Sequence, residues 1–454
     1  MPGCYLVGCG AGFSGDRTDA AVPVVAAMIA SGRPGALIFE TLAERTLALG
    51  QMARKNDPEL GYEPLLAEFL PPVLADCVNN GIPIIGNFGA ANPRAAARLI
   101  QRIARDAGLA PLRIAVVEGD DINGAVDLSG LEIWDGDAGL AGDETEVIAA
   151  NVYLGAKPIA DALLAGAQIV VTGRVVDPAL TLGALVAHFG WDWEDLDRIA
   201  AGTLAGHLLE CGAQITGGYF ADPGYKDISS PETIGFPIAE VSARGDIVIT
   251  KPAGTGGVVD LRTVKEQILY EVHDPAAYLT PDVTLDMMNV EVTQQGPDRV
   301  LVQGAAGHAP PARLKATVTY PGDWFGEAEI SYGGPNAAAR ARLAGDTLRK
   351  RIALGKLPVR IRVDLIGMQS VFDSDDGALG AAGVPEPGEV RLRLAVSGVE
   401  QKTVEVSLRE VTALYTCGPA GGGGVRTRMQ NRIKTVSYLV PRAAVSPGFT
   451  FLAR

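Results

Sequence analysis

The first half of the chain alternates two kinds of segment, and this alternation limits the fold more than any other feature. Up to about residue 215, short β-branched runs are followed by longer alanine- and leucine-rich periodic stretches, as in βα units around a parallel sheet. The runs "IPIIG" and "IAVVEG" are almost wholly apolar, which is typical of strands buried on both faces. The expected strands are Tyr5–Val7, Ala36–Phe39, Ile82–Ile85, Arg113–Val117 and Gln168–Thr172. The expected helices lie near residues 19–30, 43–55, 64–80, 93–107, 145–165 and 178–188.

The pattern changes in the second half of the chain. Residues 217–260 are rich in glycine, proline and aspartate and are expected to form loops. From about residue 290, segments such as "LKATVTY", "VRLRLAVSG" and "TVEVSLREVTALYT" alternate apolar with polar residues, as strands with one wet face do, and one helix is expected near 336–353. We therefore predict an α/β protein. A Rossmann-like parallel-sheet domain, residues 1–216, precedes an α+β domain with a mostly antiparallel sheet and glycine-rich loops, residues 217–454.

Charge and cysteine usage narrow the class of protein. The 454 residues carry a formal net charge of −14, without a basic stripe, so neither nucleic acid nor an anionic membrane is expected as a partner. The five cysteines are scattered without a C-x-x-C pair, which argues against a disulfide framework or a zinc ribbon. The N-terminus lacks the pattern of a secretory signal, and the longest apolar stretch is about half of the ~20 residues that span a membrane. We expect a cytoplasmic protein.

Polar residues follow each expected strand of the parallel sheet. In open α/β sheets ligands bind beyond the carboxyl ends of the strands, so these residues are expected to meet at one rim. Each of them alone is also the kind of residue that caps a helix or occupies a turn. The set consists of Asp16 and Arg17, then Glu40, then Asn87, Asn92 and Arg94, then Glu118, Asp120 and Asp121, and finally Arg174 and Asp177.

The turn "GCGAGFSGDR", residues 8–17, fits the dinucleotide-binding spacing G-x-G-x-x-G, and Glu40 lies where a ribose-binding acid belongs. Against NAD(P), Asp16 follows the third glycine directly, and its carboxylate would compete with a pyrophosphate for the same amide donors. We therefore expect NAD(P) not to bind there. The turn with Gly12, Asp16 and Arg17 is instead interpreted in one of two ways. Either Asp16 is a positioned acid and Arg17 binds an anion, or the two residues form a salt-bridged helix start.

A second stretch with several candidate functional residues is "AGTLAGHLLECGAQITGG", residues 201–218. On a helix, His207, Glu210 and Cys211 stand at i, i+3 and i+4 and share a face. This arrangement suits a proton relay or two metal ligands, although a surface histidine with an acidic neighbour has the same pattern. Three glycine-rich loops, at 251–257, 332–337 and 416–424, could turn backbone amides toward an anion or could simply permit tight turns. No G-x-S-x-G, Walker A or EF-hand sequence is present.

The chain resembles the N-terminal domain family of the acyclic terpene utilisation protein AtuA. The matching stretches include "GAGFSGDR", "NFGAANPRAAA", "VVEGDD", "VTGRVVDPAL", "AAGTLAGHLLECGAQITGG", "ITKPAGTGG" and "YEVHDPAAYLTPDV". The resemblance implies a cytosolic enzyme of the breakdown of branched acyclic compounds such as citronellol and geraniol, through carboxylated acyl-CoA intermediates. Longer members also carry a C-terminal ferredoxin-like domain with an "ARSGDKG" motif, which is not found here. We expect that the protein works without that domain or that a small ferredoxin-like subunit supplies it.

These observations predict a lyase or hydratase that acts by acid–base chemistry on a branched hydroxy or unsaturated carboxylate or its CoA thioester. Arg17, Arg94 and Arg174 would hold carboxylates, because guanidinium matches them bidentately. Asp120, Asp121 or Asp177, with His207 and Glu210, would move the proton, and Asn87 or the glycine loops would stabilise an enolate-like oxygen. No cofactor is identified, although clustered carboxylates could hold a divalent metal ion. The alternatives are an NAD(P)-dependent oxidoreductase and a non-catalytic subunit that organises a complex with a small ferredoxin-like chain. A homo-oligomer is expected in each case.

Overall fold

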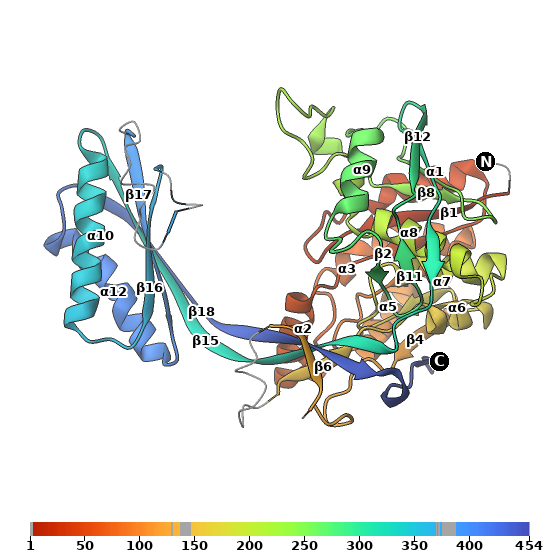
Figure 1. Ribbon diagram of the computed structural model, residues 1–454, viewed down its shortest axis with the longest axis horizontal. Helices are drawn as coiled ribbons and strands as arrows, with labels where there is room; N and C mark the ends of the chain where they lie inside the picture. The colour runs from red at the N-terminus through yellow and green to blue at the C-terminus, as the bar shows by residue number, and fades with distance from the viewer. Residues whose placement is uncertain are drawn as a thin grey trace. The chain divides into compact units, whose positions relative to one another are not determined.

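The chain forms two compact units. The computed structural model describes residues 3–128, 130–136, 147–368, 370, 373–374 and 387–453. Unit 1 comprises Met1–Thr319 and Thr435–Arg454, and unit 2 comprises Tyr320–Lys434 (Figure 1). The predicted boundary between residues 216 and 217 lies inside unit 1, because strands beyond residue 217 continue its main sheet.

Five parallel strands form the centre of the main sheet of unit 1. In spatial order they are β1 (Tyr5–Ala11), β2 (Gly35–Phe39), β3 (Ile84–Gly86), β7 (Ile169–Val171) and β4 (Ile114–Glu118). Every residue of the first four strands is buried, as their apolar sequences require. The five strands expected from the sequence are therefore confirmed, with end points shifted by a few residues.

Antiparallel strands extend this sheet at both edges. Next to β1 lie β8 (Ile238–Val241), β9 (Ile247–Thr250), β13 (Arg299–Gln303) and β12 (Glu291–Gly296), and next to β4 lies β19 (Gly448–Phe451). The protein is thus a mixed α/β protein. The Rossmann-like detail is not confirmed, since the first strand of a doubly wound sheet has parallel neighbours on both sides, whereas β1 has one parallel and one antiparallel neighbour.

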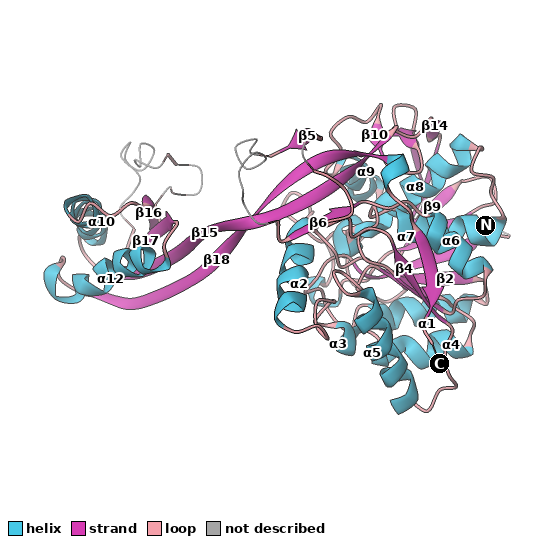
Figure 2. Ribbon diagram, turned by 90° about the horizontal axis from the view of Figure 1, so that it is seen from below, coloured by secondary structure: helices cyan, strands magenta, loops and turns pink. Residues whose placement is uncertain are grey.

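Helices cover both faces of this sheet (Figure 2). One layer contains α1 (Ala21–Ser31), α4 (Pro71–Asn79) and α5 (Pro93–Asp106), and the other contains α6 (Lys157–Leu164), α7 (Ala179–Phe189) and α8 (Leu196–Glu210). The remaining helices of unit 1 are α2 (Glu44–Asn56), α3 (Leu66–Phe69) and α9 (Leu261–Leu269), with 3-10 turns at Gly212–Thr216, Pro231–Thr233 and Arg442–Ala444. Within the described residues, no helix is long and apolar enough to cross a bilayer.

Two smaller groups of strands complete unit 1. A three-stranded sheet consists of β10 (Tyr278–Leu279), β11 (Thr284–Asp286) and β14 (Ala306–His308). The stretch expected as a helix near 145–165 instead holds β6 (Ala149–Val152) followed by α6, because β6 pairs with β15 (Arg313–Gly333). The short strand β5 (Glu132–Asp135) pairs with the end of β18 (Gly422–Pro441). Residues 145 and 146 lie outside the described part of the chain.

Unit 2 has the order β-α-β-β-α-β: β15, α10 (Ala337–Leu354), β16 (Arg360–Ile366), β17 (Glu389–Gly398), α12 (Gln401–Cys417) and β18. The sheet order β16-β17-β15-β18 is that of a ferredoxin-like fold. The antiparallel sheet and the helix near 336–353 are confirmed. The segment "TVEVSLREVTALYT" was expected as a strand but is helix α12. Its buried Val404, Leu408, Val411 and Leu414 are three or four residues apart, which is helical spacing.

Candidate active site

A cavity of about 1030 Å³ lies in unit 1 at the carboxyl ends of the parallel strands. Its walls include residues from the turns after β1, β2 and β7 and the last residue of α8. Turns that are far apart in the sequence therefore meet at one hollow. Among the residues singled out from the sequence, those that line it are Gly12, Asp16, Glu40, Arg174, Asp177, Glu210 and Cys211.

The glycine turn after β1 is filled by the protein's own groups. The carboxylate of Asp16 accepts hydrogen bonds from the backbone N–H of Gly12 at 2.8 Å and of Arg17 at 2.9 Å. A side chain at Gly12 would place its Cβ 2.4 Å from the backbone of Cys211 and Gly212, so the turn packs directly on the end of α8. A pyrophosphate at this turn would have to displace the carboxylate of Asp16 from two amides.

Arg174 is a buried arginine with only 1% of its side chain exposed. Its guanidinium donates to the carbonyl oxygens of Val175 and Leu42 and to Oδ1 of Asp177. It also stacks on the ring of Tyr153, with its central carbon 4.5 Å from the ring centroid. Because these bonds occupy most of its donors, Arg174 holds Asp177 and the loop after β2 in place and is not an open anion clamp.

Two carboxyl groups beside Arg174 retain their protons more strongly than free acids do. Glu40 accepts hydrogen bonds from the side-chain amide of Asn87 and from the Leu42 N–H. Burial, together with the negative charge of Asp177, raises the pKa of Glu40 well above its usual value despite the nearby guanidinium. Burial also raises the pKa of Asp177. A raised pKa keeps the proton on a carboxyl to a higher pH than in a free acid, and because the charge of Asp177 raises the pKa of Glu40, Glu40 is the group suited to donate a proton.

Glu44, on the same wall, has the opposite behaviour. Burial alone would raise its pKa, but a hydrogen bond from the Tyr153 hydroxyl and the ammonium of Lys315, 3.2 Å away, lower the pKa of Glu44 to about 2. The ring of Tyr153 lies within 5.0 Å of the Lys315 ammonium and within 4.5 Å of the Arg174 guanidinium. One cavity therefore contains an acid with a lowered pKa, Glu44, beside acids with raised pKa values, an arrangement typical of assigned acid and base roles.

His207 and Glu210 form a buried pair at the end of α8. The ring atom Nδ1 of His207 lies 2.9 Å from Oε1 of Glu210, and its Nε2 lies 3.2 Å from the carbonyl oxygen of Ile268. Since a carbonyl oxygen only accepts, Nε2 must carry a hydrogen. The Nδ1–Oε1 bond then holds a single proton, which leaves the pair either neutral on both residues or as an imidazolium with a carboxylate.

The other oxygen of Glu210, Oε2, takes no part in the hydrogen bond to His207. Oε2 is buried, has no hydrogen-bond partner among the described residues, and belongs to a side chain that lines the cavity. Burial raises the pKa of Glu210 to about 7. The pKa of His207 is also raised, because the charge of Glu210 and the hydrogen bond to it outweigh burial. A buried acceptor without a partner, on a group that titrates near neutral pH, is a candidate proton-transfer atom.

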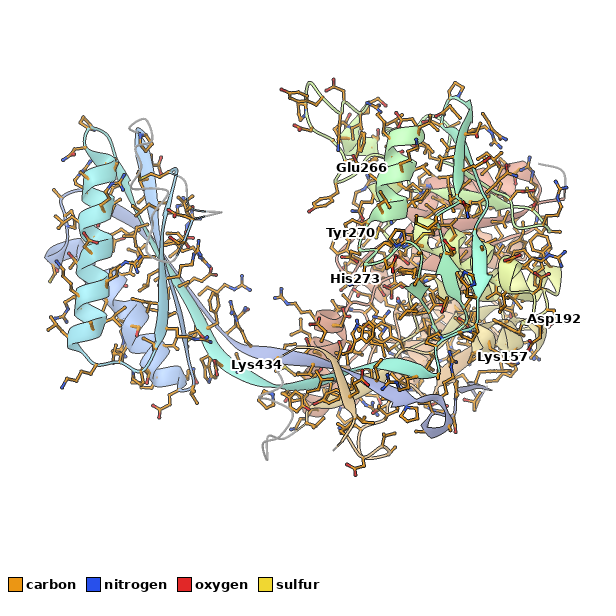
Figure 3. All side chains as sticks on the ribbon, in the orientation of Figure 1. Lys157, Asp192, Glu266, Tyr270, His273 and Lys434 are labelled. Carbon is orange, nitrogen blue, oxygen red and sulfur yellow. The ribbon has the colours of Figure 1, made fainter. Side chains whose placement is uncertain are left out.

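The rest of the cavity wall is largely apolar. Tyr270, at the C-terminal end of α9, is labelled in Figure 3 and packs edge-on against Tyr219, with ring centroids 6.4 Å apart. Tyr219 and Glu271 both line the cavity with left-handed backbone, at φ 56° each, a conformation that clusters at ligand sites in proteins. The aromatic lining residues are Phe13, Trp134, Tyr153, Tyr219, Phe236, Tyr270 and Tyr278.

The other residues proposed from the sequence lie behind the cavity or away from it. Asn87 and His207 each bond to a lining carboxyl, and Asp120 accepts the backbone N–H of Arg174 at 2.9 Å. Burial raises the pKa of Asp120 to about 6. The residues away from the cavity have structural partners: Arg94 pairs with Glu118 at 2.6 Å, Asn92 caps α5, Asp121 lies 3.6 Å from Arg54, and Arg17 pairs with Asp19 at 2.9 Å.

Glu44, Tyr153 and Lys315 are cavity residues that the sequence analysis missed. Glu44 is four residues beyond Glu40, at the end of the same turn after β2, and its place after an expected strand could have indicated it. Tyr153 and Lys315 are brought to the wall by the pairing of β6 with β15, which joins segments more than 150 residues apart. No pattern in the sequence indicates that pairing. Among the described residues, no three His, Cys, Asp or Glu side chains are arranged to hold a metal ion, so these donors do not form a site for the divalent cation considered from the sequence.

Fold and cavity together define a mixed α/β protein with a buried set of proton-carrying side chains. The chain belongs to the acyclic terpene utilisation family AtuA, whose family model matches residues 5–451. This confirms the resemblance noted in the sequence and links the chain to acyclic terpene utilisation.

Other comparisons add little. No curated protein matches the chain. Two de novo designed proteins show a partial likeness. Foldit4 is 11% identical over 24% of this chain and 98% of its own, with a TM-score of 0.18. Ferredog-Diesel is 13% identical over 23% of this chain and 83% of its own, with a TM-score of 0.16. Likenesses this small carry no argument about fold or function.

Proposed function

We propose that the protein is a cytosolic lyase or hydratase that adds water to, or removes it from, a branched unsaturated or hydroxy carboxylate or its CoA thioester. The observation that carries the proposal is the buried, unpartnered Oε2 of Glu210 at the cavity wall, backed by His207. Membership of the acyclic terpene utilisation family supports a branched acyclic substrate of the citronellol or geraniol type.

The reaction needs one proton acceptor and one proton donor. In the direction of water loss, Oε2 of ionised Glu210, stabilised by protonated His207, takes the proton from the carbon next to the carbonyl group. The electron pair of that C–H bond forms the C=C bond as the C–O bond to the hydroxyl breaks. The protonated carboxyl of Glu40 gives its proton to the departing hydroxyl, which leaves as water. The reverse sequence adds water.

The substrate's two ends match different parts of the wall. The aromatic side chains suit a branched apolar chain. Arg313 and Lys315 stand two residues apart on β15, so their side chains share a face. Arg313 pairs with Glu132 and Lys315 with Glu44, but both line the cavity with 45% and 40% of their side chains exposed, and their remaining donors can bind a carboxylate or the phosphates of CoA. They take the role that the sequence analysis gave to Arg17, Arg94 and Arg174.

Turnover of a panel of branched 3-hydroxy and 2-unsaturated acids and their CoA thioesters tests the proposal. We expect Glu210→Gln to lower kcat by about 10²–10⁴-fold, the usual contribution of a positioned acid or base. His207→Asn should lower kcat by a similar factor, because it removes the group that stabilises ionised Glu210. The matched control is Glu118→Gln, which changes the same atoms away from the cavity and should leave kcat within about twofold.

Two outcomes would count against this function. If Glu210→Gln keeps kcat within tenfold of the wild type, Glu210 does not transfer the proton. If the wild type turns over no member of the panel, the alternatives gain ground. Turnover that appears only with NAD(P) would favour the oxidoreductase, and no turnover with or without NAD(P) would favour a non-catalytic subunit.

A further inference from the structure

The two units carry opposite net charges. Unit 2, residues 320–434, contains 16 Lys and Arg against 13 Asp and Glu, a net charge of +3. The remaining residues, which form unit 1, contain 23 Lys and Arg against 40 Asp and Glu, a net charge of −17. The net charge of −14 for the whole chain therefore conceals a basic unit joined to a strongly acidic one.

The described helices of unit 2 cover one face of its sheet, and the face without helices is called the open face below. Helices α10 and α12 lie side by side on one face, over a core that includes Ile330, Leu392 and Leu408 (Figure 1). On β18, Val425 and Met429 pack against this core. Because side chains alternate along a strand, the even-numbered residues of this part of β18 belong to the face without helices.

Arginines predominate on that open face. Arg391 and Arg393, on β17, pair with acids of the neighbouring strands, Arg391 with Glu329 at 3.4 Å and Arg393 with Glu327 and Asp364. These cations are neutralised within the sheet. These ion pairs leave little net charge on this part of the sheet for a partner.

Three arginines of β18 differ from these. Arg426, Arg428 and Arg432 are exposed and have no carboxylate within ion-pair distance among the described residues. Arg428 bonds to Gln430 at 2.9 Å, and Arg432 lies over the ring of Phe325 at 3.5 Å. In residues 422–434, β18 is an edge strand, since its pairing with β5 is confined to residues 437–439. This face of the sheet thus ends in a row of exposed guanidinium groups that have no carboxylate partner within the described part of unit 2.

We propose that this arginine row is a docking surface for a second copy of the chain, whose acidic unit 1 it contacts. Charge complementarity supports this occupant, because the chain itself carries a unit with a net charge of −17. Each copy has the arginine row and the acidic unit, and in a two-fold dimer such a contact is made twice. Edge-strand arginines can also serve only to prevent strand pairing, and the experiment separates the two roles.

Sedimentation velocity of the full chain tests the proposal. The wild type should sediment as a dimer at low ionic strength and dissociate as salt is raised, because the screening length falls from about 30 Å at 0.01 M to about 3 Å at 1 M. The triple variant Arg426→Glu, Arg428→Glu and Arg432→Glu should sediment as a monomer throughout. Arg426→Glu with Arg428→Glu alone leaves the Phe325 stacking in place and should weaken the dimer at least tenfold.

A matched control reverses the same number of charges on the helices of unit 2. Lys350, Lys402 and Arg409 are exposed residues of α10 and α12, and their replacement by glutamate should leave the dimer intact. A monomeric wild type at low salt overturns the proposal. A dimer that withstands both salt and the arginine reversals assigns the row to edge protection alone. Equal dissociation of the control shows that only the net charge matters, and the row is then not the contact.

Discussion

Replacing Glu210 by glutamine should make the stability of the protein depend less on pH. In the folded protein Glu210 keeps its proton up to a pKa of about 7, whereas in the unfolded chain it ionises near 4.5. Between these values the folded state binds more protons, so the free energy of unfolding falls as pH rises. A difference of about 2.5 pKa units corresponds to about 3 kcal/mol. Glutamine does not titrate, so the free energy of unfolding of the variant does not fall with pH for this reason.

The raised pKa of His207 acts in the same direction. Protonation of His207 stabilises the folded wild type at low pH, and this stabilisation disappears as pH rises through its folded pKa. The variant lacks the negative charge that raises the pKa of His207. The two shifts belong to one coupled pair, because the negative charge of Glu210 that raises the pKa of His207 is absent once Glu210 is protonated, so they are not added. The free energy of unfolding of wild type minus that of the variant should therefore be about 3 kcal/mol higher at pH 5 than at pH 8.

Urea titrations followed by circular dichroism at pH 5 and pH 8 measure this difference directly. Glu59→Gln, at an exposed position, serves as the control and should stay within about 0.5 kcal/mol of the wild type at both values. If the difference between wild type and Glu210→Gln changes by less than 1 kcal/mol across this range, Glu210 titrates as an ordinary surface acid. The inference that Glu210 and His207 form a buried pair with raised pKa values would then be wrong.

Two further variants probe the framework of the site. Arg174→Lys should destabilise the protein by about 3–5 kcal/mol and lower its melting temperature, because an ammonium cannot reach all the carbonyls and the Asp177 carboxylate that the guanidinium satisfies. Retention of the wild-type melting temperature would refute this. Gly12→Ala should cost about 1–3 kcal/mol in thermal or urea unfolding, because its Cβ would lie 2.4 Å from the backbone after α8. Gly296→Ala meets no atom within 4 Å and should be nearly neutral, so equal losses in both variants would contradict the packing argument.

Local rules in the sequence located much of the fold. Apolar runs bounded by turns identified the parallel strands, because burial on both faces leaves little choice of residue. The same rules suggested that Asp16 fills the glycine turn, and its two backbone hydrogen bonds agree with that interpretation. These inferences succeeded because each depended on interactions within a few residues.

What the sequence did not show depends on distant pairing. Strand β8 joins the main sheet next to β1 across more than 200 residues, so the division at residue 216 was not a structural boundary. Lys315 reaches the cavity only because β15 pairs with β6. Helix α12 was mistaken for a strand because valine and threonine favour strands locally, while the spacing of its buried residues is helical. Tertiary packing decided each of these cases.

Strand β19 constrains the order in which the main sheet is completed during translation. It pairs with β4 from Gly448↔Glu118 to Phe451↔Ala115, so the β4 edge of the main sheet stays open until residues 448–451 are synthesised. Unit 2, residues 320–434, precedes β19 in the chain and can fold before unit 1 is complete. Nascent chains thus expose the unpaired β4 edge during translation, and chaperones can bind this edge during that period.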